Sequence, residues 1–286
     1  MTKIVFFGSS EYSTIILNSL LTITAFSVVA VVTKSDKPMG RDQTITPNPV
    51  AKFATDHHLS LHQIEIFDST IISSLSSLEP DLGLCVAFGP PFFSSSFINL
   101  FPQKIINIHP SPLPKYRGAT PGPWQIINDE TTSAITFFQI DELPDHGPII
   151  CQIPFDISPT DTADSFYQKA FTLASQNLAI ILNKYLSNID ILTPQDHSQK
   201  TYFSKLDKNN AKINWQESEQ KIERTIRALS PWPIAWTEIK NKQGKILKMK
   251  ILSAKFDQKL ILDQVQIEGK TITLWPEIEK YYQIIK

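Results

Sequence analysis

Short apolar runs alternate with amphipathic stretches along most of the 286-residue chain. The runs indicate buried strands, because a strand that is covered on both faces is continuously apolar rather than alternating. The stretches between them have the three-to-four-residue spacing of helices. This rhythm predicts an α/β fold, a Rossmann-like parallel sheet with helices on both faces. The expected strands are 3–7, 27–33, 61–66, 82–88, 104–109, 134–140 and 148–157, and the expected helices lie around 15–21, 47–58, 68–78 and 161–185.

The α/β rhythm stops at a polar stretch that we interpret as a linker, residues 187–203. Beyond it, one amphipathic helix at 217–229 precedes short strand-like runs at 234–239, 245–252 and 260–267. One helix with several short strands is typical of a small OB-like β-barrel, a fold that often binds nucleic acid. We therefore expect a Rossmann-like domain over 1–186 and a β-barrel domain over 204–286.

Charge is divided unevenly between these two parts. Residues 205–286 hold 16 Lys and Arg against 10 Asp and Glu, whereas residues 1–204 hold 11 against 18. A basic domain joined to an acidic one indicates a polyanionic partner, although lysine-rich solvated surfaces are also common. The chain has two cysteines and no apolar stretch near the roughly 18 residues that cross a bilayer. We expect a cytoplasmic protein with no signal peptide, no disulfide framework and no membrane contact.

The first predicted strand ends in FFGSSE, where Gly8 stands alone. A dinucleotide fingerprint needs three glycines at this point, so we do not expect NAD or FAD. The histidines, cysteines and acidic residues lack the spacing of a zinc site, and no metal is expected. Ser9 and Ser10 lack the glycine-flanked turn of a nucleophilic serine.

Two polar side chains interrupt the end of the buried strand 104–109. Asn107 and His109 are two residues apart, so in a strand they face the same side. The carboxyl end of a parallel strand is where open α/β sheets bind ligands. Three prolines at alternate positions stiffen the loop that follows. The pair is therefore a candidate site beside a rigid loop; the alternative is a turn cap next to a satisfied surface histidine.

An acidic loop follows the predicted strand 134–140. It carries Asp141, Glu142 and Asp145, and we expect it to leave the sheet at the same edge as His109. A carboxylate there would pair with the imidazolium and stabilise its charged form. Chemistry alone does not choose among the three acids, and a solvated acidic turn is the simpler alternative.

Two motifs carry a resemblance to the folate-dependent formyltransferase family: NIHPSPLPKYRG, which begins at Asn107, and LPDHGPII, which contains Asp145. The family has an Asn-x-His, a Ser-Leu-Leu-Pro-type loop and an Asp-x-Gly. Other segments resemble the inserted loop and the C-terminal domain of those family members that act on methionyl-tRNA. These segments are 33–50, 202–215, 226–239 and 265–278, so the resemblance covers nearly the whole chain.

The resemblance implies a catalytic trio of Asn107, His109 and Asp145, and it thereby selects Asp145 among the three acids. It also implies 10-formyltetrahydrofolate as the formyl donor and requires no metal. In the implied mechanism, Asn107 and a protonated His109 donate hydrogen bonds to a tetrahedral oxyanion, while Asp145 orients His109. The residues implied to contact folate are Ser111, Pro112, Leu113, Pro114, Val86, Ala87, Phe88 and Gly89.

The acceptor implied by the resemblance is initiator methionyl-tRNA. Arg41, in the inserted loop, would reach the acceptor stem. Lys245, Lys248 and Lys250 would contact the phosphate backbone. We expect Trp232 and Trp236 to be core anchors rather than base-stacking platforms, and the protein to be a monomer.

Several positions depart from the family pattern. The folate loop reads Ser-Pro-Leu-Pro, His146 stands where Thr is common, and Asp42 with Gln43 replaces a basic pair. The C-terminal domain looks shortened by one or two strands. These changes bear on tRNA affinity more than on catalysis. The alternative functions are formyl transfer to an amino-sugar nucleotide, which would not need the inserted loop, and RNA binding without catalysis, against which the intact trio argues.

Overall fold

The computed structural model describes residues 1–39, 42–187 and 192–286, which form two compact units. The first, here called the sheet unit, comprises Met1–Arg117, Ala134–Phe155 and Gln168–Tyr202. The second, here called the barrel unit, comprises Gly118–Ser133, Asp156–Tyr167 and Phe203–Lys286. No helix within the described residues is both long and apolar enough to cross a membrane.

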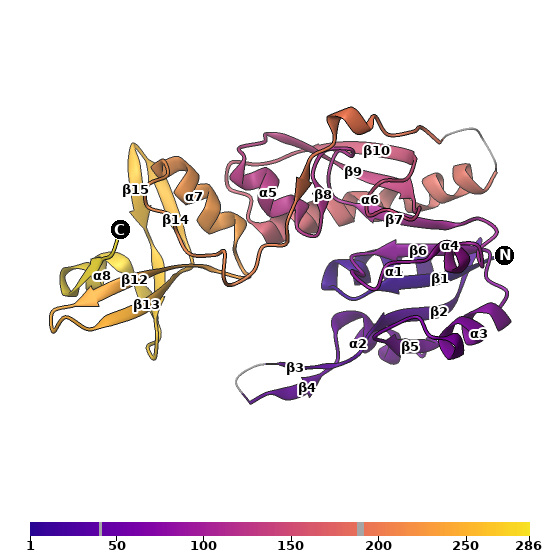
Figure 1. Cartoon of the computed structure of the whole chain (residues 1–286), viewed down its shortest axis with the longest axis horizontal. Helices are drawn as coiled ribbons and strands as arrows, with labels where there is room; N and C mark the ends of the chain where they lie inside the picture. The colour runs from indigo at the N-terminus through magenta and orange to yellow at the C-terminus, as the bar shows by residue number, and fades with distance from the viewer. Residues whose placement is uncertain (40–41, 188–191) are drawn as a thin grey trace. The chain divides into compact units, whose positions relative to one another are not determined.

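A seven-stranded sheet, in the order β10-β9-β7-β6-β1-β2-β5, forms the centre of the sheet unit (Figure 1). From β5 to β7 the neighbouring strands are parallel, which confirms the predicted Rossmann-like sheet. The strands are β1 (Thr2–Gly8), β2 (Phe26–Lys34), β5 (Leu61–Ile64), β6 (Leu82–Val86), β7 (Ile105–His109), β9 (Thr132–Gln139) and β10 (Ile149–Asp156).

The acidic loop after β9 does not leave the sheet at the carboxyl edge of β7, and that expectation was wrong. β9 runs antiparallel to β7, pairing His109 with Thr136 and Ile106 with Gln139. β9 therefore ends beside the amino-terminal half of β7. The apolar sequence of β9 did not reveal this, because a continuous apolar run fits a buried strand of either direction.

Helix α1 begins at a reciprocal cap that also ties it to the sheet. The Ser10 side chain accepts from the backbone N–H of Ser13, and the Ser13 side chain accepts from the backbone N–H of Ser10. The Ser13 hydroxyl in turn donates to the carbonyl of Val86, 2.7 Å away at the end of β6. A Cβ on Gly8 would lie 2.8 Å from that of Ser13, so the lone glycine serves this close packing. The helices of this part of the chain are α1 (Glu11–Leu21), α2 (Pro49–Asp56), α3 (Ser69–Ser77), α4 (Ser95–Ile98) and α6 (Ala163–Leu186).

The inserted loop contains two short strands that the sequence pattern did not predict. β3 (Lys37–Met39) and β4 (Thr44–Thr46) pair antiparallel and form a hairpin that extends from the sheet unit (Figure 1). The polar side chain of Asn48 closes the base of this loop, since it caps α2 and donates to the carbonyl of Lys34 at 2.8 Å. Two further short strands, β8 (Arg117–Gly118) and β11 (Tyr202–Phe203), pair with each other.

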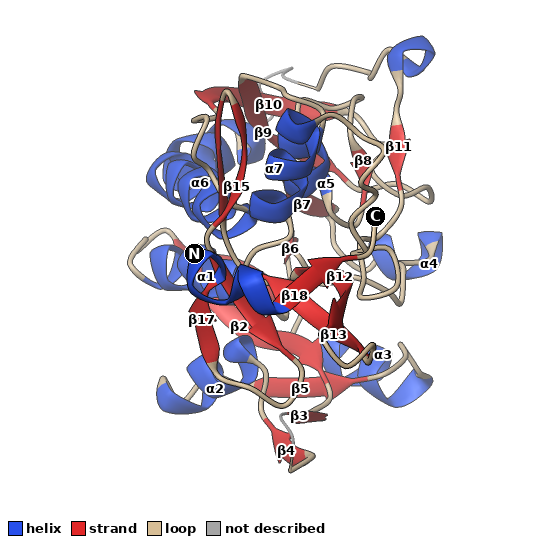
Figure 2. Cartoon of the chain, turned by 90° about the vertical axis from the view of Figure 1, so that its left-hand side faces the viewer, coloured by secondary structure: helices blue, strands red, loops and turns tan. Residues whose placement is uncertain are grey.

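The barrel unit contains an antiparallel five-stranded sheet in the order β17-β16-β13-β12-β18. Figure 2 shows β18, β12 and β13 side by side. The sheet curls into a half-barrel, consistent with the predicted OB-like domain. The elements of the barrel unit are α5 (Pro121–Ile127), α7 (Glu219–Ala228), β12 (Ala235–Asn241), β13 (Ile246–Ile251), β14 (Ala254–Asp257), β15 (Lys259–Leu262), β16 (Gln264–Ile267), β17 (Ile272–Leu274), α8 (Trp275–Ile278), the 3₁₀ turn η2 (Glu279–Tyr281) and β18 (Tyr282–Ile284). A second 3₁₀ turn, η1 (His197–Gln199), lies in the sheet unit.

The apolar run 260–267, predicted as one strand, is two strands with different partners. β15 pairs with β14 in a separate hairpin, whereas β16 pairs with β13 in the main sheet. The break falls at Asp263, whose carboxylate accepts a hydrogen bond from the Ser253 hydroxyl at 3.0 Å. A side chain that binds this locally redirects the chain between two apolar segments.

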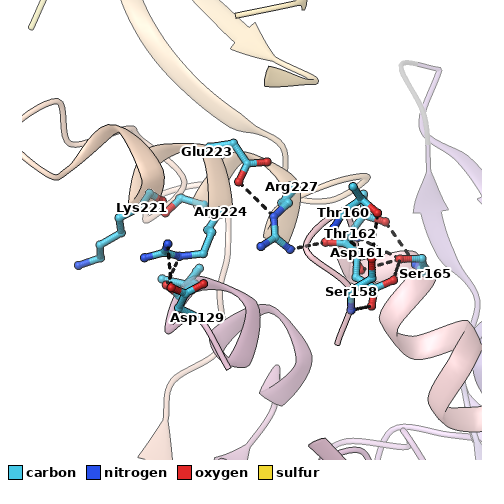
Figure 3. Close-up of polar contacts among 12 residues, drawn as sticks. Asp129, Ser158, Thr160, Asp161, Thr162, Ser165, Lys221, Glu223, Arg224 and Arg227 are labelled. Atoms are coloured by element: carbon cyan, nitrogen blue, oxygen red, sulfur yellow. Dashed lines mark hydrogen bonds and ion pairs between the residues drawn. The ribbon is translucent and has the colours of Figure 1, made fainter. Parts of the chain in front are cut away.

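Helix α7 is fastened to earlier parts of the chain by two arginines (Figure 3). Arg224 forms an ion pair with Asp129 at 3.2 Å. Arg227 pairs with Glu223 one turn earlier and donates to the backbone carbonyl of Asp161 at 2.7 Å. These contacts explain why α7 forms one compact unit with residues more than sixty positions before it.

A cluster of phenylalanines fills one side of the sheet unit. Phe7 is fully buried and meets its neighbours edge to face, with ring centroids 5.0–6.2 Å away. Edge-to-face packing of this kind adds to the free energy gained by burying the rings. The neighbours of Phe7 are Phe67, Phe88, Phe93, Phe97 and Phe101.

We expect Phe7→Ala to lower the free energy of unfolding by about 3–5 kcal/mol, because it removes a ring that no neighbour replaces. Urea denaturation followed by circular dichroism measures the loss. Phe92→Ala is the matched control, since that ring is 66% exposed, and it should change stability by less than about 0.5 kcal/mol. Equal losses in the two variants would show that the cluster does not stabilise the fold.

Candidate active site

Strand β7 places Asn107 and His109 on the same face of the sheet. Asn107 lies in register between Cys85 of β6 and Phe138 of β9, so hydrogen-bonded neighbours hold it from both sides. His109 is 5% exposed, whereas Asn107 is half-buried. Over the residues that the structure describes, the side-chain amide of Asn107 has no hydrogen-bond partner. It is therefore available to a ligand.

The two nitrogens of His109 face two different acceptors. Nε2 lies 3.0 Å from the backbone carbonyl of Tyr116. Because a carbonyl only accepts, Nε2 carries the hydrogen. Nδ1 lies 3.6 Å from Oδ1 of Asp145, and both side chains are mostly buried. At 3.6 Å from Oδ1 of Asp145, Nδ1 also has room to contact a second partner.

Asp145 reaches His109 because its loop folds back tightly. Asp145 has a backbone φ of 53°, the left-handed conformation that non-glycine residues adopt uncommonly. Two residues later, a Cβ on Gly147 would lie 1.9 Å from the carbonyl oxygen of Gln139. Glycine is therefore the residue that the return path of the loop admits, and this accounts for the Asp-x-Gly pattern.

The other two acids of the loop have partners of their own. Asp141 pairs with Nδ1 of His146 at 2.7 Å, and Glu142 accepts a hydrogen bond from the hydroxyl of Ser95. The structure thus places Asp145 opposite His109, the acid that the resemblance also selected.

The loop after β7 is held by hydrogen bonds within the sheet unit. The hydroxyl of Ser111 donates to the carbonyl of Lys115 at 2.8 Å, and the Thr136 hydroxyl donates to the Ser111 carbonyl at 2.6 Å. Gln152 donates to the carbonyl of Leu113 at 2.7 Å. Ser111 and Leu113 are buried, whereas the two prolines of the predicted folate loop, Pro112 and Pro114, are half-buried. The Ser111 hydroxyl therefore shapes the loop.

The segment predicted to flank the folate begins at the end of β6. The strand ends at Val86 rather than at Phe88, because Ala87 and Gly89 have φ values of 46° and 71°. Val86 is fully buried and Phe88 belongs to the phenylalanine cluster, whereas Ala87 and Gly89 are exposed. The exposed members of this segment are therefore its two small residues.

Cys85 lies beside Asn107 in the register but does not supply a nucleophile. Burial raises the pKa of its thiol to about 12, and the negative charge of Asp145 acts in the same direction. At neutral pH the thiol stays protonated, and a thiol is a much weaker nucleophile than a thiolate.

Sequence analysis missed three residues that border the site. Arg117 is buried and donates through one nitrogen, Nη2, to Gln195 at 2.6 Å and to His197 at 2.8 Å. Burial lowers the pKa of Arg117, an effect opposed by the charges of Asp145, Asp141 and Tyr202. Arg117 stands within the quoted KYRG motif, and the buried Gln195 lies in the predicted linker, where polar composition hid it.

The predicted tRNA-binding lysines belong to the barrel unit. Lys245, Lys248 and Lys250 are exposed, and the Lys248 ammonium lies 3.7 Å from the centre of the Trp236 ring. Trp236 is half-buried, but Trp232 is 50% exposed, so the expectation that both are core anchors fails for Trp232. The exposed ring follows from its position between two prolines in a turn that ends before β12.

Arg41, the remaining candidate for contact with tRNA, lies outside the described residues. Within residues 1–39, 42–187 and 192–286, no group of three His, Cys, Asp or Glu side chains gathers as a metal site would require.

Comparison with known proteins decides the family. The model of the formyl transferase family matches residues 2–182, and the model of its C-terminal domain matches residues 205–277. The chain belongs to the formyl transferase family. It is 35% identical to the methionyl-tRNA formyltransferase of Chloroflexus aurantiacus over 88% of this chain and 81% of that protein. It is 36% identical to the enzyme of the same name from Staphylococcus epidermidis over 89% of this chain and 82% of that protein.

Solved structures share the fold of this formyltransferase. The methionyl-tRNA formyltransferase from Clostridium thermocellum has a TM-score of 0.62 at 16% identity, covering 93% of this chain and 99% of that one. An N-formyltransferase from Helicobacter canadensis, in complex with folinic acid and dTDP-3-aminofucose, has a TM-score of 0.64 at 22% identity, covering 91% and 89%.

We expect Gly147→Ala to reduce the rate of formyl transfer by at least about tenfold, because a Cβ there must push the Asp145 loop off the Gln139 backbone. Steady-state kinetics measures this loss. Leu143→Ala in the same loop is the control, since that side chain is 56% exposed. A normal rate for Gly147→Ala would show that the tight return of the loop is not needed for activity.

Proposed function

We propose that this enzyme transfers the formyl group of 10-formyltetrahydrofolate to the amino group of initiator methionyl-tRNA, giving N-formylmethionyl-tRNA for translation initiation. The observation that carries the proposal is the opposition of His109 and Asp145 beside the amide of Asn107, for which the described residues offer no hydrogen-bond partner. The identity of 35–36% with methionyl-tRNA formyltransferases, over most of both chains, supports the choice of acceptor. The enzyme acts as a monomer in the cytoplasm.

The transfer proceeds directly from donor to acceptor. The amino group of an aminoacyl ester is less basic than a free α-amino group, which titrates near 8, so a large share of it is neutral at pH 7. Its lone pair attacks the formyl carbon and forms the new C–N bond. The resulting oxyanion accepts hydrogen bonds from the Asn107 amide and from Nδ1–H of His109. Donors of this kind each contribute on the order of 3 kcal/mol of transition-state stabilisation.

The intermediate then breaks down as its proton moves between nitrogens. The bond from the formyl carbon to N10 of the folate breaks, and its electron pair returns to N10. The attacking nitrogen loses one proton and N10 gains one, with Asp145 and His109 as the relay. Asp145 also orients His109 through the contact at 3.6 Å.

The folate lies between the loop after β7 and the end of β6. Contacts come from the loop residues Ser111, Pro112, Leu113 and Pro114 and from Val86, Phe88 and Gly89. Because the Ser111 hydroxyl is committed to Lys115 and the Val86 side chain is buried, these segments present backbone groups and proline rings to the ligand.

The acceptor RNA binds the barrel domain, 204–286, and the inserted loop of the catalytic domain, 1–186, with 187–203 joining the two. Lys245, Lys248 and Lys250 supply phosphate contacts, and Arg41 contacts the acceptor stem. The exposure of the three lysines supports this assignment.

The decisive test uses labelled 10-formyltetrahydrofolate with either charged initiator methionyl-tRNA or an amino-sugar nucleotide. We expect transfer to the tRNA and none to the sugar.

His109→Ala should lose at least about a hundredfold in rate, because both the oxyanion donor and the proton relay are removed. His58→Ala, at an exposed histidine, is the control. Transfer to the sugar alone would replace this proposal with the sugar enzyme.

Replacing Lys245, Lys248 and Lys250 by alanine should weaken tRNA binding and leave turnover at saturating tRNA unchanged. The slope of log Kd against log salt should also fall, by about 0.7–0.9 for each phosphate that is no longer neutralised by a lysine. Filter binding at several salt concentrations measures both quantities. Lys52→Ala with Lys184→Ala, at exposed sheet-unit lysines, is the control. An unchanged salt slope in the triple variant would remove these lysines from the interface.

A further inference from the structure

The segment predicted as a linker contains a buried polar side chain that binds the catalytic loop. Gln195 is 5% exposed, although the residues around it are exposed. Its Nε2 donates to the backbone carbonyl of Asp145 at 3.1 Å and to that of Gly147 at 2.7 Å. The neighbouring Thr193 pairs with Ile149 at the start of β10, so the segment enters the sheet unit as an added bridge. Gln195 therefore holds both ends of the Asp-x-Gly turn.

Arg117 fixes the orientation of the Gln195 amide. Its Nη2 donates at 2.6 Å to Oε1 of Gln195. Because a guanidinium only donates, the oxygen of the amide faces Arg117 and the nitrogen faces the two carbonyls. The same Nη2 lies 2.8 Å from Nδ1 of His197, whose ring stacks on His146 at 4.0 Å. The amide is thus held from one side and binds the turn with the other.

The turn needs such a partner. Asp145 has a left-handed backbone conformation, which is unfavourable for a residue with a side chain and persists where the surroundings hold it. Two carbonyls turned inward also need donors, and Gln195 supplies a donor to each. The two bonds tie the backbone on both sides of His146 and thereby restrict where the Asp145 carboxylate can lie.

We propose that Gln195 is a positioning residue for catalysis, acting through the backbone carbonyls of Asp145 and Gly147 to keep the Asp145 carboxylate opposite His109. This inference rests on the proposed function, because it takes Asp145 as the partner of a catalytic His109. It assigns a role in catalysis to the segment between the two domains.

Gln195→Met is the direct test, since methionine fills the same space and makes neither hydrogen bond. We expect kcat for formyl transfer to fall by about 10- to 100-fold with KM for 10-formyltetrahydrofolate changed by less than about threefold, because a displaced catalytic group slows the chemical step. Gln199→Met is the matched control, an exposed glutamine of the same segment, and should match the wild type. Wild-type kcat in Gln195→Met would overturn the proposal.

A double-mutant cycle with Asp145→Ala separates positioning from general loss of stability. If Gln195 acts through Asp145, then Gln195→Met should lower kcat by less than about twofold in the Asp145→Ala background. A loss of the same size in both backgrounds would overturn the proposal. If Asp145→Ala keeps the wild-type rate, the proposed mechanism and this inference both fail. If Asp145→Ala is slow but Gln195→Met has the wild-type rate, only the inference fails.

Gln195→Glu provides a second variant that preserves shape and the bond from Arg117. Its second carboxylate oxygen would face the carbonyls of Asp145 and Gly147 without a hydrogen to donate. We expect kcat to fall here as well, and the ratio of variant to wild-type kcat to rise as the pH is lowered, because the protonated carboxyl regains one donor. A wild-type kcat across the pH range would contradict the proposal even if the methionine variant does not fold.

Discussion

The pairing of β7 with two neighbours of opposite direction is the constraint on which the site depends. β6 is parallel to β7 and β9 is antiparallel to it. A slip of one residue in either ladder would turn Asn107 and His109 to the other face of the sheet. Each of the two ladders therefore fixes the face on which these side chains lie. The antiparallel partner has a second effect. Because β9 ends beside the start of β7, the loop that follows must double back to bring an acid to His109.

That doubling back explains most of the unusual features around Asp145. The tight return needs a glycine at 147, a left-handed residue at 145 and donors for the carbonyls between them. The donors come from Gln195, far along the chain. The proposed catalytic pair, His109 and Asp145, therefore combines one residue on a strand with one on a turn that Gln195 holds. A loop that carries a catalytic group is as precise as the partners that fix it.

The sequence predicted the architecture better than the connections within it. The main strands and the longer helices of the sheet unit lie where apolar periodicity predicted them, but the hairpin of β3 and β4 was not predicted. Strand periodicity placed Asn107 and His109 on one face as a candidate pair. The direction of β9 was missed, because an apolar run carries no information on its neighbour. Gln195 was missed for a related reason: a buried glutamine in a polar segment looks like a linker until its partners, two backbone carbonyls, are known. The strand-like run around Asp263 likewise hid a change of partner.

The groups around the site also support our proposal that the formyl group passes directly from donor to acceptor. Covalent catalysis needs a free hydroxyl or an ionised thiol. The hydroxyl of Ser13 is bound to the end of β6, and that of Ser111 is bound within its own loop. The thiol of Cys85 is kept protonated by burial. These three groups thus serve the fold, whereas Asn107, His109 and Asp145 offer a set of hydrogen-bond donors and a proton relay. Such a set suits an acceptor that brings its own nucleophile, as an amine does.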